Sequence, residues 1–263
     1  MTELESQPPE LLEGDAPDEP VEELTRMTLL GHLEELRSRI IRCLIAAIIA
    51  FVACFAFVKD IYRFLERPIL NVLPEGEKLV FLKLTDPLFL YVKVSALVGL
   101  FLISPYLLFQ VWRFVAPGLY KNERRYSIPF VFFGSTFFLA GGTFAYFVAF
   151  PFAVEFLIKV GEDNFKAAVT GHSYFSFLMT VILGMGLMFE LPIFILVLSQ
   201  IGLVTPRFLL KNFRWAVLII FVVSAIITPT GDPINLLIFA VPTIVLYLLG
   251  IAVAAVFTKK QAE

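Results

Sequence analysis

Six apolar segments constrain most strongly how this chain of 263 residues can fold. Hydrophobic residues make up 59% of the sequence and the mean hydropathy is +0.84, well above the values of water-soluble domains. The segments are residues 40–58, 88–111, 127–152, 174–198, 215–227 and 234–257. Most of them reach the length of about 20 residues that a helix needs to cross a bilayer. The sequence therefore predicts an all-α integral membrane protein with six transmembrane helices.

The fifth segment is short, and prolines interrupt several of the others. A helix over residues 215–227 would rise only about 20 Å, whereas the hydrocarbon core is about 30 Å thick. The sixth segment contains Pro242, and we expect it to be kinked and short as well. A proline break persists in lipid only where neighbouring helices satisfy the freed backbone groups. We therefore expect a bent, rigid assembly, with further prolines at Pro105, Pro129, Pro151 and Pro192.

Charged residues divide the chain into a tail and a membrane domain. Residues 1–23 contain nine acidic residues, four prolines and no basic residue, a composition typical of disorder. We expect an acidic, disordered tail at 1–26, a six-span membrane domain at 27–257 and a short C-terminal tail at 258–263. An even number of spans places both termini on one side of the membrane, and thirteen Lys and Arg residues lie at the segment ends on that side. By the positive-inside rule, both termini are expected in the cytoplasm.

Two loops on the opposite side are too long to be simple turns. Residues 59–87 include PEGEKLVFLKLTDP, whose alternation of polar and apolar residues favours a short hairpin or an amphipathic cap. Residues 153–173 include EFLIKVGEDNFKAAV, which favours a helix at the surface.

The stretch HLEELRSRI places two glutamates directly before the first apolar segment. Glu35 precedes Arg39 by four residues and Glu34 precedes Arg37 by three, and both spacings favour ion pairs on a helix. One interpretation is an amphipathic interfacial helix held by its own ion pairs. The other is that these carboxylates recognise a ligand.

A second stretch, WRFVAPGLYKNERR, joins the second and third apolar segments and places Glu123 among basic residues. The basic residues alone satisfy the positive-inside rule. Glu123 is therefore either part of a local salt bridge or a further recognition residue.

Glu190 lies inside the fourth apolar segment, two residues before Pro192. An ionisable side chain at that depth costs about 2.5 kcal/mol or more on insertion scales, so it is expected to face protein or water. It is either a protonated carboxyl bonded to a carbonyl that Pro192 frees, or a site for a partner helix or a passage. Near the other end, TPTGDP predicts a tight turn in which Asp232 caps the sixth helix.

The sequence contains no recognisable set of catalytic or metal-ligating residues. Its two histidines and two cysteines are scattered, and the motifs HExxH and GxSxG are absent. We therefore expect a protein that is not an enzyme and has no metal site. A proton-coupled transporter of small solutes that uses Glu190 is the alternative function, although the two halves of the chain show no repeat.

Five motifs occur together in the order of one membrane-protein family. They are HLEELRSRI before the first span, APGLYKNERR in the following loop on the side of the termini, AYFVAFPFA at the end of the third span, FELP in the fourth and TPTGDP before the sixth. Over residues 27–257 the chain thus resembles the TatC family, the receptor subunit of the twin-arginine protein translocase. The resemblance implies binding of twin-arginine signal peptides of folded cargo through Glu35, Glu123 and Arg37, with Arg39 helping to orient Glu35.

The resemblance also implies partners within the lipid bilayer. TatA- and TatB-type single-span subunits are expected near the last three spans, where Glu190 faces a concave side. Candidate polar contacts for these subunits are Thr228, Asp232 and Asn235. Transport is expected to use the proton motive force in a complex within which the chain self-associates, and no nucleic acid is expected. The chain departs from the family at Asn122, where histidine is frequent, and at Asn235-Leu236, where Ser-Gln is usual.

Overall fold

The computed structural model describes residues 21–73, 78–115, 127–161, 168–228 and 230–259. Its helices are α1 Val21–Ala56, α2 Val58–Leu70, α3 Asp86–Val115, α4 Ser127–Phe144, the π-helical turn η3 Ala145–Ala149, α5 Phe150–Gly161, α6 Gly171–Phe189, α7 Leu191–Gln200, α8 Pro206–Lys211, α9 Phe213–Ile227 and α10 Pro233–Lys259. Within the described ranges, extended segments pair only at one isolated bridge, Val80–Thr170. The all-α fold is confirmed.

Five helical stretches are long and apolar enough to cross a membrane, and a shorter apolar helix accompanies them. The long stretches are Leu33–Ala56, Asp86–Phe114, Pro129–Gly161, Gly171–Gln200 and Pro233–Phe257, and the short one is Phe213–Ile227. They coincide with the six predicted segments. The interpretation as six spans with a short fifth helix is therefore confirmed.

Two boundaries differ from the expectation. The sixth span is not short, because α10 continues through Pro242 and contributes a predominantly apolar stretch of 25 residues, about 37 Å of helix. At the other end of the chain, α1 begins at Val21, inside the stretch that we expected to belong to the tail. Residues 1–20 and 260–263 lie outside the described residues, so the disorder of the acidic tail and the short C-terminal tail stay predictions there.

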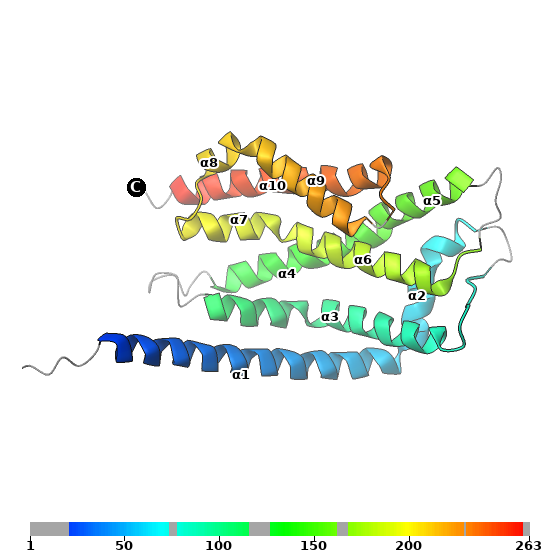
Figure 1. Ribbon diagram of the computed structural model, residues 1–263, viewed down its shortest axis with the longest axis horizontal. Helices are drawn as coiled ribbons and strands as arrows, with labels where there is room; N and C mark the ends of the chain where they lie inside the picture. Colours follow the sequence, from blue (N-terminus) through cyan, green and yellow to red (C-terminus); the bar gives the residue numbers. More distant parts are fainter. Residues whose placement is uncertain (1–20, 74–77, 116–126, 162–167, 229, 260–263) are drawn as a thin grey trace, which may run out of the picture.

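The spans lie side by side, and α1 begins at the same end of the molecule at which α10 ends (Figure 1). We call this the terminal end, and the opposite one, where α2 and α5 lie, the α2 end. Helix α1 packs mainly on α3, α3 on α4, α4 on α6, α7 on α10 and α10 on α9. The opposite face of α1 is more than half exposed at Ile40, Leu44, Ile48 and Val52. Such an apolar exposed face is expected of a helix in contact with lipid.

Prolines reshape the third and fourth spans. Pro151 follows the π-helical turn η3, which joins α4 to α5. Pro192 lies in the first turn of α7, directly after the break in the helix at Glu190. Proline has no N–H to donate to the preceding turn, so the backbone loosens there. By contrast, α3 and α10 each continue through an internal proline.

The amphipathic helix α2 runs across the direction of the spans (Figure 1), and the sequence did not predict it as a helix. Its apolar face, which includes Leu65, is buried in the core. The Tyr174 hydroxyl donates to the Leu65 carbonyl at 2.9 Å, and the Tyr146 hydroxyl donates to the Phe64 carbonyl. Because Pro68 cannot donate to the Phe64 carbonyl, Tyr146 satisfies an acceptor that α2 leaves open.

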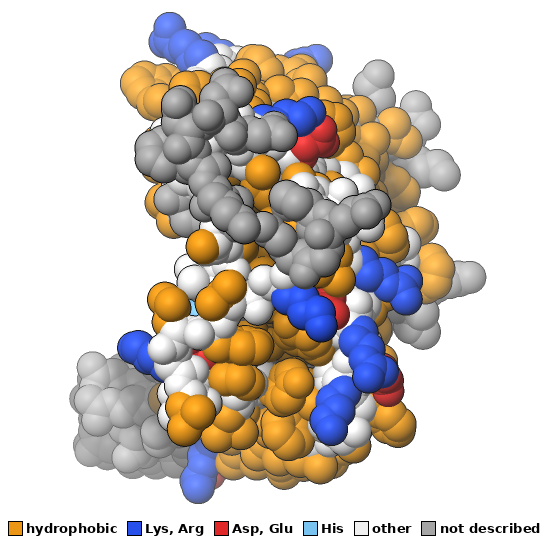
Figure 2. All heavy atoms as spheres, turned by 90° about the vertical axis from the view of Figure 1, so that its right-hand side faces the viewer, with side chains coloured by type: hydrophobic (Ala, Val, Ile, Leu, Met, Phe, Trp, Pro, Cys, Tyr) orange, Lys and Arg blue, Asp and Glu red, His pale blue; other side chains and the backbone are white. Residues whose placement is uncertain are grey.

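The two long loops meet at the α2 end instead of folding separately. The Val80 N–H donates to the Val169 carbonyl, and the Val80 carbonyl accepts from the Gly171 N–H, both at 3.0 Å. No hairpin forms within the described part of residues 59–87, whereas the helix expected in the second loop is present in part as α5. Figure 2 shows Lys and Arg side chains interspersed with apolar ones over this end.

Replacing Tyr146 with phenylalanine is expected to destabilise the protein by about 0.5–1.5 kcal/mol, the net contribution of a typical hydrogen bond, because the bond to the Phe64 carbonyl is only partly buried. The ring would keep its stacking on Phe64, at a centroid distance of 4.8 Å, so the change isolates the hydroxyl. Tyr91→Phe is a matched control, since the Tyr91 hydroxyl has no hydrogen bond to the described residues. Thermal unfolding in detergent measures the effect. Equal midpoints for the two variants would contradict the role of Tyr146.

Candidate functional site

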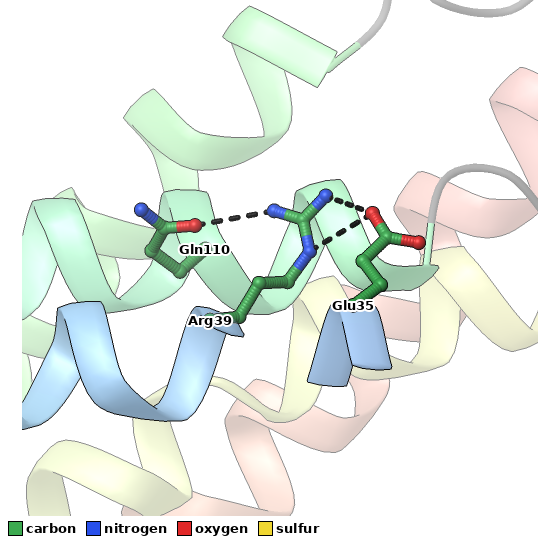
Figure 3. Close-up of polar contacts among 3 residues, drawn as sticks. All are labelled: Glu35, Arg39 and Gln110. Carbon is green, nitrogen blue, oxygen red and sulfur yellow. Dashed lines mark hydrogen bonds and ion pairs between the residues drawn. The ribbon is translucent and has the colours of Figure 1, made fainter. Parts of the chain in front are cut away.

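Glu35 and Arg39 lie one turn apart on α1, at the start of the first span (Figure 3). Arg39 donates from Nε to Oε1 of Glu35 at 3.1 Å, and from Nη2 to the same oxygen. The side chain of Arg39 is 10% exposed and that of Glu35 is 39% exposed. The ion pair predicted from the spacing is therefore confirmed. It joins a carboxylate at the surface to a buried guanidinium.

Helix α3 covers Arg39 and supplies its second partner. The Nη1 atom of Arg39 donates to Oε1 of Gln110 at 3.1 Å, across the interface between α1 and α3. The amide nitrogen of Gln110 donates in turn to the Tyr106 hydroxyl at 2.7 Å. Glu35, Arg39, Gln110 and Tyr106 thus form one continuous polar chain, which we call the Arg39 chain. It leads from the surface into the interface between α1 and α3.

Other predicted residues of this region stand apart from the Arg39 chain. Glu34 and Arg37 are exposed on α1, and the ion pair expected between them is not among those formed by the described residues. Glu123 belongs to residues 116–126, which lie outside the described residues. The structure therefore places only Glu35 of the two predicted recognition carboxylates.

Glu190 lies at the break between α6 and α7, inside the fourth span. Its carboxyl faces Gly134 on α4, where an added methyl group would lie 3.3 Å from Oε2 and 3.7 Å from Oε1. Oε1 is buried and has no hydrogen-bond partner among the described residues. The bond to a freed carbonyl that we considered is therefore not formed. Oε1 of Glu190 is thus a polar atom that the described helices bury without satisfying.

The turn between α9 and α10 contains the three remaining predicted residues. Asp232 accepts hydrogen bonds from the Asn235 backbone N–H and side-chain amide, both at 2.8 Å, so the predicted cap is confirmed. Partial burial raises the pKa of Asp232, but hydrogen bonds from Thr230 and Asn235 outweigh it and hold the pKa below its ordinary value. Thr228 is buried and donates to the Ser224 carbonyl at 2.8 Å. Because these contacts lie within the turn, a docking role for the three residues stays a prediction.

A cavity of about 530 Å³ opens between α6, α7, α9 and α10. Its lining is mostly apolar and includes Leu187, Leu191, Trp215, Ile219 and Ile220. We call it the α9 groove. Such a surface suits an apolar helix or a lipid chain better than a polar ligand.

Comparison with known proteins identifies the family. The family model described as Sec-independent protein translocase protein (TatC) matches residues 31–242. The chain belongs to the TatC family. The TatC protein of Koribacter versatilis is 44% identical over 236 residues, which cover 89% of this chain and 87% of the relative. The TatC protein of Escherichia coli is 35% identical over 223 residues, which cover 85% and 86%.

A solved structure supports the assignment to the TatC family. The crystal structure described as "Twin Arginine Translocase Receptor- TatC in DDM" superposes with a TM-score of 0.77 at 36% identity, covering 85% of this chain and 99% of the other. With its apolar helices, the chain is thus a multi-pass membrane protein and a Sec-independent translocase protein of the TatC family, a family not known as an enzyme. The transporter alternative finds no support among these relatives.

Two residues inside the TatC-matching stretch contact predicted site residues but were not singled out from the sequence. Gln110 interrupts an apolar segment, and a buried amide requires a partner, so this signal could have marked it. Nothing in the local sequence marks Gly134, because its importance depends on Glu190 on another span.

Proposed function

We propose that this TatC-family chain is the receptor subunit of a twin-arginine translocase in the cytoplasmic membrane. The terminal end faces the cytoplasm, and Glu35 and Glu123 bind the two arginines of the signal peptide on a folded precursor. The Glu35–Arg39 pair is the observation that supports this most directly. A carboxylate at the surface already accepts two N–H groups of one guanidinium, the group that such a peptide presents.

A carboxylate of this kind can separate arginine from lysine. Guanidinium is planar, always charged and carries five donors in a fixed fork, whereas the lysine ammonium is a compact point charge. A hydrogen bond to a charged group contributes about 1.5–3 kcal/mol, equivalent to about 10- to 150-fold in affinity. Two carboxylates therefore suffice to select for two arginines, and the apolar part of the signal peptide adds the remaining affinity. Arg37, exposed two residues after Glu35, belongs to the same recognition surface.

The partner sites lie on the last three spans in this proposal. TatA- and TatB-type single-span subunits dock along the α9 groove, with Thr228, Asp232 and Asn235 as polar contacts and Glu190 facing the interior of the complex. The helix α9 has 15 residues and is about 22 Å long, so the bilayer thins beside it or neighbouring helices cover its ends. The proton motive force drives export, no cofactor is required, and several copies of the chain associate.

Binding of a twin-arginine signal peptide to the purified full chain tests the recognition step, with a twin-lysine peptide for comparison. Glu35→Ala is expected to lower the affinity for the twin-arginine peptide about tenfold or more, because a hydrogen-bonded charge is lost. It should lower the affinity for the twin-lysine peptide less, because the ammonium loses a charge partner but no forked hydrogen bond. Glu34→Ala is the matched control, since Glu34 is adjacent, exposed and forms no ion pair with the described residues.

The same assay applied to Glu123→Ala tests the second carboxylate. Equal affinity of the unmodified chain for the two peptides would exclude selection of arginine by this surface. Unchanged binding by Glu35→Ala would remove Glu35 from recognition.

A further inference from the structure

Gln110 lies where the Arg39 chain crosses from α1 to α3 (Figure 3). Arg39 and Gln110 are both buried, at 8% and 5% exposure. A buried guanidinium needs acceptors on all its edges, because an unpaired buried charge is costly. Glu35 satisfies Nε and Nη2 of Arg39, and Gln110 satisfies Nη1. The guanidinium is therefore held from two helices at once.

The neighbours of Gln110 determine how its amide is oriented. Arginine has only donors, so the amide must turn its oxygen toward Arg39. The amide nitrogen then points the other way and donates to the Tyr106 hydroxyl, one turn earlier on α3. A reversed amide would place two donors against each other at Arg39. Tyr106 thus helps to keep the acceptor of Gln110 directed at Arg39.

We propose that Gln110 is a positioning residue for the signal-peptide site: it fixes Arg39, and Arg39 in turn sets the position of the Glu35 carboxylate. This inference rests on the proposed function. A recognition group is selective when surrounding contacts hold its geometry. Gln110 supplies such a contact although it does not itself touch Glu35 or the peptide.

Arg39 also competes with the peptide, because both present a guanidinium to Glu35. While Gln110 holds Nη1, Arg39 can offer Glu35 only its Nε and Nη2 edge, and both of these donors go to the single oxygen Oε1. Without Gln110, Nη1 would be left buried and unpaired, and the guanidinium would gain by turning Nη1 toward the carboxylate. A second arginine would then displace it less readily.

Gln110→Leu is therefore expected to reduce the preference for arginine. We define this preference as the dissociation constant of the twin-lysine peptide divided by that of the twin-arginine peptide. It should fall about tenfold or more, the effect of one hydrogen bond to a charged group. Twin-lysine affinity should change little.

Two further variants separate positioning from packing. Gln110→Asn withdraws the acceptor by one methylene and should also reduce the preference, which keeps the test informative if leucine prevents folding. Gln110→Glu retains an acceptor at the same reach, so it should preserve the preference. Thermal unfolding in detergent verifies that each variant is folded.

The outcomes are distinct. The inference is overturned if the preference is unchanged in Gln110→Leu and Gln110→Asn. It is also overturned if these variants lose affinity for both peptides equally, or if Gln110→Glu loses as much of the preference as the leucine variant. A preference already absent from the unmodified chain would overturn twin-arginine recognition and this inference together. A preference that is present in the unmodified chain and persists in Gln110→Leu overturns the inference alone.

Discussion

Export of a folded twin-arginine reporter is expected to fall about tenfold or more when Glu190→Ala replaces the native chain, whereas signal-peptide binding at the terminal end stays near normal. The estimate corresponds to one hydrogen bond to a charged group, about 1.5–3 kcal/mol. Oε1 of Glu190 is buried and unsatisfied by the described residues. Since an ionisable group inside a span costs about 2.5 kcal/mol or more, the assembled complex is expected to supply its missing partner.

Two measurements on the same variants test this expectation. Export is measured in cells that lack their own TatC-family protein, and peptide affinity is measured on the purified chain. Phe194→Ala is the control, because Phe194 lies one turn later on α7, is 60% exposed and does not line the α9 groove. Glu190→Gln keeps the shape and the acceptor oxygen, so it should export better than the alanine variant. Normal export by Glu190→Ala would show that the carboxyl has no role in assembly or passage.

The spans were predictable because lipid-facing helices are apolar on all sides. Hydropathy alone therefore marks them, as in α1, whose exposed face is as apolar as its packed one. The length of the fifth span followed from Arg214, which precedes it, and from the turn sequence TPTGDP, which follows it. The prediction that the sixth span is short was wrong because we gave Pro242 too much weight. A proline removes only one backbone hydrogen bond, and α10 continues as a helix through it.

Helix α2 was missed for a different reason. Its 13 residues alternate charged and apolar side chains with a helical period, and they contain Pro68, which favours a loop interpretation. What stabilises the helix is tertiary: Tyr146 and Tyr174 reach its carbonyls from other helices. The sequence of residues 58–70 alone does not predict the hydrogen bonds from those two hydroxyls.

In the candidate site, too, the contacts within one helix were predictable and the contacts between helices were not. The Glu35–Arg39 pair was predictable because four residues of separation place two side chains together on any helix. The contact of Arg39 with Gln110 joins α1 to α3, and the contact of Glu190 with Gly134 joins the fourth span to the third. Such contacts depend on which helices are neighbours, and hydropathy does not encode that order. Glu123 lies outside the described residues, so its part in recognition stays a prediction.

Gly141 allows α4 and α6 to pack closely together. Gly141→Ala is expected to destabilise the fold by about 1–3 kcal/mol or more, the usual cost of overpacking a core. A methyl group there would lie 2.6 Å from the Met185 carbonyl oxygen and 2.8 Å from Cβ of Phe189. Both atoms are fixed by the backbone of α6 and cannot rotate away, so α4 and α6 would have to separate. Small residues allow such close approach between spans.

The consequence extends beyond one contact. Met185 is fully buried, and Phe189 immediately precedes Glu190, so separating α4 from α6 would also shift the carboxyl that faces Gly134. Thermal unfolding in detergent and the yield of monodisperse protein measure the effect, with Gly161→Ala as the control because nothing lies within 4 Å of the added methyl group. A Gly141→Ala variant as stable as Gly161→Ala would mean that α4 and α6 can part without cost. In that case the position of Glu190 would have to be set by helices other than α4.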